Sequence, residues 1–263
     1  MTNRIVCMRW GKVYTDEHVE KLFDQINKNC SVPFDFHLFD NVDDMKWNAA
    51  QKLHFRGLDD PDQRAQGAWN DFERDDCGGL THYRKLLMFK FDTGGGYWVD
   101  PPWKTEYKTL NWSPDDTILY LDLDSIILGD LAWFFDQDMS KPWIVKSYWF
   151  DKGDGGEWKR QYHLRRCPYF NSSVLLWKPG QNRPIFDLIN NNLDEVFFTY
   201  GVNDNFMFHL FGPYAYDQAR REHFNVFPPG IITSQKYSDP LDKGIVHSLE
   251  GMSIAEKNEI CFR

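Results

Sequence analysis

The stretch from 116 to 127 is an apolar, partly β-branched run that ends near two carboxylates, Asp122 and Asp124. Turn-forming pairs bound it on both sides, Pro-Asp at 114–115 and Gly-Asp at 129–130. A continuous apolar run of this kind predicts a strand that is covered on both faces, as in the parallel sheets of α/β proteins. Because ligands of open α/β sheets bind beyond the carboxyl ends of the strands, the pattern also predicts a ligand site at the two acids.

Two carboxylates one residue apart repel each other unless a cation or a proton separates them. The economical interpretation is that Asp122 and Asp124 help to hold a divalent metal ion. A solvated acidic strand end is the structural alternative.

Composition narrows the class of protein. The 263 residues are enough for one large α/β domain or two small ones, and the 42% of hydrophobic residues can supply a core. The net charge of −9 is spread along the chain, which argues against a dedicated nucleic-acid binder. No apolar run approaches the roughly 18 residues of a membrane span, and no secretory leader precedes the first expected strand. The odd number of cysteines without a CxxC pair predicts thiols in a reducing compartment, so we expect a soluble cytoplasmic protein.

The start of the chain has the pattern of half a nucleotide-binding α/β unit. A strand is expected at 4–8, a turn with a central glycine at 9–14, a helix from Thr15 with an apolar face to about 26, and a second strand at 34–39. The GxGxxG fingerprint is absent from this turn, which disfavours a nicotinamide or flavin protein.

Further elements follow along the chain. We expect strands at 143–145, 169–177, 225–227, 231–234 and 244–247, helices at 80–87, 184–193 and 202–210, and a polar tail. The connection 92–114 is long for a compact domain and is therefore expected to carry function, and 150–166 has the composition of a polar loop.

Several islands of sequence occur in the order seen in one known group of enzymes. They are Leu-Tyr-Leu-Asp-Leu-Asp at 119–124, Gly-Asp-Leu at 129–131, Tyr-Phe-Asn-Ser-Ser-Val-Leu-Leu at 169–176, Asn-Asp-Asn at 203–205 and Gly-Ile-Val-His at 244–247. This order resembles the GT-A glycosyltransferases, most closely glycosyltransferase family 8, the group of glycogenin and bacterial galactosyltransferases. The resemblance implies a Rossmann-like α/β fold of the GT-A type, a single domain over 1–263 with a mostly parallel central sheet flanked by helices. Residues 1–125 would form its nucleotide-binding half and residues 126–263 its sugar- and acceptor-binding half.

The resemblance also implies a metal site made by Asp122, Asp124 and His247. Without it, a lone histidine would be interpreted as structural. Carboxylate oxygens together with one imidazole suit Mn²⁺, and Mg²⁺ less well because it prefers oxygen ligands throughout.

Donor-binding positions are implied on three segments of the nucleotide-binding half. They are Trp10, Gly11 and Tyr14 in a base-binding loop, Asp40 for base or ribose, and Arg84 and Lys85 on a basic helix. The alternatives are a packed Trp and Tyr and solvated helix charges. At the sugar end, the resemblance implies Asn171 and Asp204, the latter orienting the sugar or stabilising positive charge at its anomeric carbon. The alternative for Asp204 is an N-cap of the following helix.

The chain departs from the family after His247, where the Lys-Pro-Trp ending is missing. A lysine that commonly meets the donor diphosphate is thereby lost. Lys236, Lys243, Arg84 or Lys85 are the candidates to replace it.

These features predict a metal-dependent glycosyltransferase that moves a hexose from a nucleotide-diphosphate sugar, a UDP-sugar, to a glycan or other hydroxyl acceptor. Resemblance to family 8 implies retention at the anomeric carbon, with 150–166 as a lid over the donor. Inversion would instead need a general base, for which Asp151 or Asp154 are the candidates. One rival is a sugar-1-phosphate nucleotidylyltransferase, although Trp-Gly-Lys at 10–12 is a poor version of its phosphate loop. The other is a sugar- or nucleotide-binding protein of the same fold without turnover.

Overall fold

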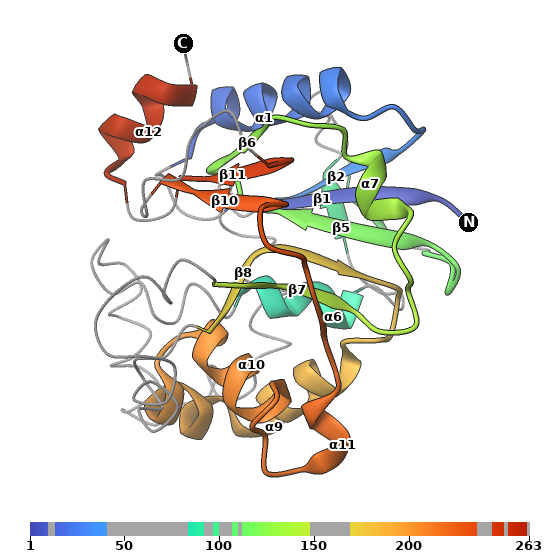
Figure 1. Ribbon diagram of the computed structural model, residues 1–263, viewed down its shortest axis with the longest axis vertical. Helices are drawn as coiled ribbons and strands as arrows, with labels where there is room; N and C mark the ends of the chain where they lie inside the picture. Colours follow the sequence, from blue (N-terminus) through green and yellow to red (C-terminus); the bar gives the residue numbers. More distant parts are fainter. Residues whose placement is uncertain are drawn as a thin grey trace.

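The structure is a computed structural model, which describes residues 1–9, 14–40, 84–91, 97–99, 107–109, 112–147, 169–235, 244–249 and 252–261. A central sheet runs through the molecule, with helices on both of its faces (Figure 1).

The central sheet has eight strands in the order β4-β3-β2-β1-β5-β8-β7-β9. Their bounds are β1 Asn3–Arg9, β2 Asp35–Asp40, β3 Tyr97–Val99, β4 Tyr107–Thr109, β5 Thr117–Leu121, β7 Trp143–Lys146, β8 Phe170–Trp177 and β9 Asn225–Val226. Strands β2, β1 and β5 are parallel, whereas β8 pairs antiparallel with β5. The predicted α/β fold with a parallel centre is confirmed, and antiparallel partners beyond it make the sheet mixed.

Helices cover the two faces, and a small second sheet lies above one of them. The helices are α1 Asp16–Asn29, the 3₁₀ turn η2 Arg84–Leu87, α6 Met88–Phe91, α7 Ala132–Phe135, α9 Arg183–Tyr200, α10 Asn203–Phe211, α11 Gln218–Arg221 and α12 Ile254–Cys261. The second sheet has the order β10-β11-β6, with β6 Ser125–Ile127, β10 Ile232–Ser234 and β11 Val246–Ser248. In Figure 1, α1, α12 and this small sheet lie on one side of the central sheet, and α6, α9, α10 and α11 lie on the other.

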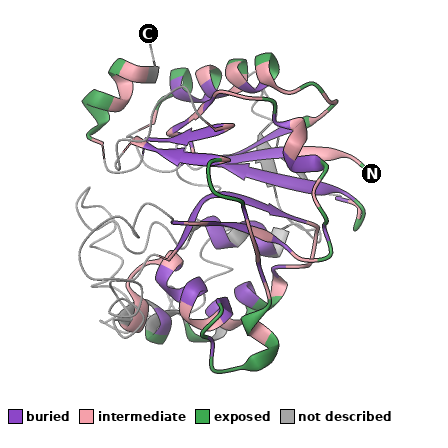
Figure 2. Ribbon diagram, in the orientation of Figure 1, coloured by how far each residue is buried: buried purple, intermediate pink, exposed green. Residues whose placement is uncertain are grey.

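Strand β5 explains why the central apolar run is continuous. All five of its residues are buried, as Figure 2 shows for the whole centre of the sheet. Leu119 and Leu121 belong to the apolar cluster on the α1 side, and Ile118 and Tyr120 belong to the cluster on the α9 and α10 side. Successive side chains of a strand point to opposite faces, so a strand between two covered faces must be apolar at every position.

The predicted run of 116–127 divides into two strands at the acids. After Leu121 the backbone turns, and the Ser125 amide donates to the Asp122 carbonyl at 3.1 Å. Residues 125–127 then leave the central sheet and join the second sheet as β6. The two acids therefore lie in the turn where the chain passes from one sheet to the other.

A buried carboxylate fixes the start of β5 against β1. Asp116 is 1% exposed and accepts hydrogen bonds from the amides of Thr2 and Ser113 and from Arg4 Nε at 2.7 Å. Burial raises the pKa of Asp116, but these hydrogen bonds and the Arg4 charge outweigh it and hold the pKa below its usual value. The ion pair between Arg4 and Asp116 joins β1 to the start of β5 and so helps to fix the register between the two strands.

Most predicted elements are present, with three differences. The expected polar tail contains a helix, α12. The long connection 92–114 contains β3 and β4. The helix expected at 80–87 is observed as η2 and α6 within the described stretch 84–91. None of the described helices is both long and apolar enough to pass through a bilayer.

Candidate active site at the end of β5

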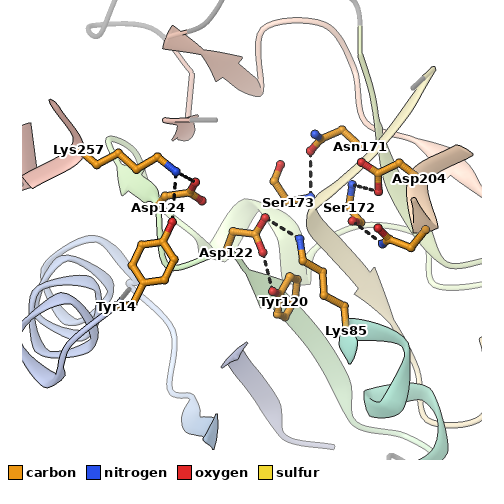
Figure 3. Close-up of polar contacts among 11 residues, drawn as sticks. Tyr14, Lys85, Tyr120, Asp122, Asp124, Asn171, Ser172, Ser173, Asp204 and Lys257 are labelled. Carbon is orange, nitrogen blue, oxygen red and sulfur yellow. Dashed lines mark hydrogen bonds and ion pairs between the residues drawn. The ribbon is translucent and has the colours of Figure 1, made fainter. Parts of the chain in front are cut away.

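Asp122 lies directly after β5 and has two buried partners (Figure 3). Lys85 Nζ, on η2, donates to Asp122 Oδ2 at 2.7 Å, and the hydroxyl of Tyr120 donates to Oδ1 at 2.5 Å. The Lys85 side chain is 5% exposed and that of Asp122 is 20% exposed. The carboxylate is thus held in one orientation by a charged and a neutral donor.

Asp124 has a different lysine. Lys257 Nζ, on α12, donates to Asp124 Oδ2 at 2.7 Å and to the hydroxyl of Tyr14 at 3.2 Å. Figure 3 shows this group on the side of Asp124 that faces away from Asp122. A lysine on the last described helix therefore links the acid to the tyrosine just before α1.

The cluster contains more acid than base. Burial raises the pKa of Asp122 to about 6, and the Asp124 charge adds to this, although Lys85 and Tyr120 oppose it. Burial lowers the pKa of Lys85, but the surrounding carboxylates, Asp122 above all, outweigh burial and raise this pKa overall. The two shifts have different main causes: burial raises the pKa of Asp122, and the neighbouring carboxylates raise the pKa of Lys85. Within the described site, Asp122, Asp124 and Asp204 are set against only two lysines, so one more cation would be favoured there.

Strand β8 and helix α10 form the opposite wall. Asp204 Oδ1 accepts from the Ser172 amide at 3.1 Å, and Asn171 Oδ1 accepts from the Ser173 amide at 2.9 Å. The ladder between β7 and β8 shifts register here, because Ile144 pairs with Leu175 while Val145 pairs with Asn171. Such irregularities often adjoin active sites, where they change the direction of a side chain.

The alternative role of Asp204 as a helix cap is wrong. The N-cap of α10 is Val202, and Asp204 lies in the first turn of the helix. Its carboxylate instead joins α10 to the backbone of β8, so it lies at the wall of the site with a fixed orientation.

His247 is fully buried on β11, next to the turn that holds the acids. In the second sheet it pairs with Ile126 of β6 on one side and with Thr233 of β10 on the other. Its Nδ1 lies 2.7 Å from Thr233 Oγ1, and its Nε2 lies 3.3 Å from Gln235 Oε1. Gly244, with φ of 89°, leads into this strand, and a Cβ there would lie 3.0 Å from two backbone oxygens. The predicted Gly-Ile-Val-His segment thus has a backbone reason for its glycine.

The donor set suits a divalent cation in its chemistry. Among the residues that the structure describes, no three His, Cys, Asp or Glu side chains are clustered closely enough to hold a metal by themselves. Carboxylate and imidazole are nevertheless the ligand types that Mn²⁺ uses, and His247 lies on the strand that pairs with β6, directly after the acids. A hydrogen bond to Nδ1, such as that with Thr233, commonly orients a histidine ligand. In the conformation observed, lysine ammonium groups bind both carboxylates.

Not every predicted position can be placed. The structure brings together Tyr14, Lys85, Asp122, Asp124, Asn171 and Asp204 (Figure 3). Trp10, Gly11, Asp151, Asp154, Lys236 and Lys243 lie outside the described residues. Of Asp40 and Arg84 the structure gives only the backbone, at the end of β2 and the start of η2.

Lys257 is the residue of the site that the sequence analysis missed. It lies ten positions after His247, in a stretch interpreted as a polar tail. The available signal was the helix-forming composition of 254–261 together with the missing family lysine, because a lysine on a helix after the histidine strand can reach the same acids.

No known protein family model matches this sequence, and no curated protein matches it. Solved structures do match. A glycosyltransferase involved in the glycosylation of the major capsid of PBCV-1 matches with a TM-score of 0.50 at 13% identity, over 100% of this chain and 99% of the other. The galactosyltransferase LgtC, in complex with donor and acceptor sugar analogues, matches with a TM-score of 0.57 at 14% identity, over 98% and 95%. GlyE of Streptococcus pneumoniae TIGR4 matches with a TM-score of 0.50 at 14% identity, over 100% of this chain and 61% of its own.

At these identities the likeness shows the fold alone. The chain has the α/β fold of the GT-A glycosyltransferases, as its sequence predicted. The match extends over nearly the full length of two of these structures.

Replacing Lys85 by Met should destabilise the metal-free protein, because it removes the cation from a largely buried carboxylate. At pH 7, one unit above the wild-type pKa of Asp122 of about 6, we expect a loss of roughly 1 kcal/mol. The folded-state pKa of Asp122, already above its unfolded value of about 3.9, should rise further. A carboxyl group with a raised folded pKa contributes stability that is present below its unfolded pKa and is lost as pH rises through its folded pKa. The deficit of the variant should therefore be small below about pH 6 and grow as the pH rises above that value.

Urea unfolding in EDTA at several pH values measures this deficit. Lys85→Arg, which keeps the charge, is the control and should lose much less. A deficit of Lys85→Met that is the same at all pH values would show that the ion pair with Asp122 is not its cause.

Proposed function

We propose that this protein is a metal-dependent glycosyltransferase that moves a hexose from a nucleotide-diphosphate sugar, a UDP-sugar, to a hydroxyl group of a glycan or another acceptor. The observation that carries the proposal is the pair of carboxylates at the carboxyl end of β5, in an excess of negative charge, within a glycosyltransferase fold. In α/β sheets this edge is where ligands bind. A diphosphate can bind near such acids only when a cation separates the two sets of negative charge.

Asp122, Asp124 and His247 are the residues that would hold the metal, with Mn²⁺ fitting this ligand set better than Mg²⁺. When bound, it supplies Lewis-acid stabilisation of the departing nucleoside diphosphate. The chain itself contributes the orientation. Tyr120 and Lys85 fix the Asp122 carboxylate, and Thr233 fixes the His247 ring.

The remaining site residues divide between the two ends of the donor. Tyr14, just before α1, would lie at the nucleotide end, in the half that residues 1–125 would form. Asn171 and Asp204 lie on the other wall, in the half formed by residues 126–263, where the sugar and acceptor would bind. A fixed carboxylate at that end can stabilise the positive charge that develops on the anomeric carbon.

We place this activity in the cytoplasm. Neither Cys7 nor Cys30, the two cysteines among the described residues whose state the structure gives, is in a disulfide, which suits a reducing compartment.

Binding of a nucleotide should depend on both the metal and Asp124. Thermal unfolding can be measured with a panel of nucleotides and nucleotide sugars, with and without Mn²⁺. In the presence of Mn²⁺, UDP or one UDP-sugar at about 100 times the Kd of that nucleotide should add roughly 2.7 kcal/mol of stability. Asp124→Asn should lose this gain. Asp187→Asn is the matched control, because Asp187 is an exposed acid paired with Arg183 on α9. A gain that persists without metal or in Asp124→Asn contradicts the proposed donor site, and release of UDP from a donor distinguishes a transferase from a protein that only binds.

The reaction should retain the anomeric configuration. In a retaining transfer the departing phosphate can accept the acceptor proton on the same face, so the chain need not supply a general base there. The anomeric proton of the first-formed product, observed by NMR, should report the configuration of the donor. The opposite configuration would refute retention and direct attention to a carboxylate base such as Asp151 or Asp154.

A further inference from the structure

Lys257 and Asp124 form an ion pair that is largely shielded from water. Their side chains are 13% and 14% exposed, and the ammonium nitrogen lies 2.7 Å from Asp124 Oδ2. A pair at this depth matters more than a surface pair, because little water is present to solvate a charge left alone. Each group therefore needs a partner of opposite charge in this position.

Helix α12, which carries Lys257, has little apolar attachment to the rest of the molecule. It has eight residues, and none of its described side chains, from 254 to 260, is buried. Helices this short are marginal by themselves. Polar contacts on one side of the helix attach it: Lys257 binds Asp124 and Tyr14, and Asn258 Oδ1 lies 2.7 Å from Nε2 of His18 on α1. The position of α12 thus depends strongly on the Asp124 contact.

The two lysines of the site differ in this respect. Lys85 is buried on η2, just before the core residues Leu86 and Met88. Lys257 is on α12 at the edge of the molecule, next to the first turn of α1 (Figure 1). A second cation at Asp124 would repel the Lys257 ammonium. Because α12 is held mainly by polar contacts, it is the element that can move away.

We propose that Lys257 is the built-in counter-ion of Asp124 in the metal-free protein, and that a divalent cation at Asp124 displaces it and loosens α12. This inference rests on the proposed function, which makes Asp124 a metal ligand. Without metal, Lys257 balances the charge of the Asp124 carboxylate. Docking of α12 and binding of the metal therefore compete for the same carboxylate. By thermodynamic linkage, a change that weakens the docking of α12 must strengthen metal binding, by at most the same factor.

Titration with Mn²⁺ alone, followed by the EPR signal of the unbound ion, measures the competition. Lys257→Met should bind Mn²⁺ at least about five-fold more tightly than the wild type, the lower end of the usual range for coupled sites. Asn258→Ala leaves the charge and the metal ligands unchanged and removes only the contact with His18. It should tighten binding by about two- to three-fold, in line with the loss of one hydrogen bond.

Lys141→Met is the charge-matched control, because Lys141 is exposed and paired with Glu222. It should leave Mn²⁺ affinity unchanged. Hydrogen exchange gives the structural readout: Mn²⁺ should speed exchange of the α12 amides in the wild type, whereas in Lys257→Met they should exchange fast from the outset.

The outcomes separate the two levels of the account. If Asp124→Asn binds Mn²⁺ as well as the wild type, Asp124 is not a metal ligand and the proposed metal site fails. If Asp124→Asn loses binding but Lys257→Met and Asn258→Ala match the wild type, the metal site stands and the competition is refuted. Tighter binding in Lys257→Met alone, with no change in α12 exchange on adding Mn²⁺, would also refute the release of the helix.

Discussion

The site depends on an imbalance of charge at one edge of the sheet. Asp122 and Asp124 are brought together by the turn after β5, Asp204 lies on the facing wall, and two lysines are the cations that the described residues supply. Burial makes the imbalance costly, as the raised pKa of Asp122 shows. A ligand that brings positive charge would relieve it, as the metal of the proposed donor site would.

Strand pairing determines where the two acids lie at this edge of the sheet. Strand β5 lies between β1 and β8, so its backbone hydrogen bonds are satisfied up to Leu121, and the Asp122 amide then donates to the Ser173 carbonyl at 2.9 Å. The same turn sends the chain into the second sheet, where β6 pairs with the strand of His247. One change of direction therefore places the two acids and brings the histidine strand beside them.

Local sequence predicted the parts of the site that follow from strands. The apolar run before Asp122 predicted a strand covered on both faces, and the burial of β5 and the fold confirmed it. Local sequence could not predict which lysine binds which acid, because this depends on packing between elements that are distant in the chain. Lys257 is 133 residues from Asp124, and α12 has too weak an apolar pattern to be recognised as part of the domain. The metal, the donor and retention remain predictions from resemblance and chemistry.

The most direct measurement is anomalous diffraction from crystals grown with Mn²⁺ and UDP, collected at the manganese edge. The account predicts one strong anomalous peak in contact with the carboxylates of Asp122 and Asp124, with density for a diphosphate beside it. A diphosphate bound at this edge without manganese, or manganese bound only elsewhere on the protein, would contradict the claim that these two acids form the metal-dependent donor site.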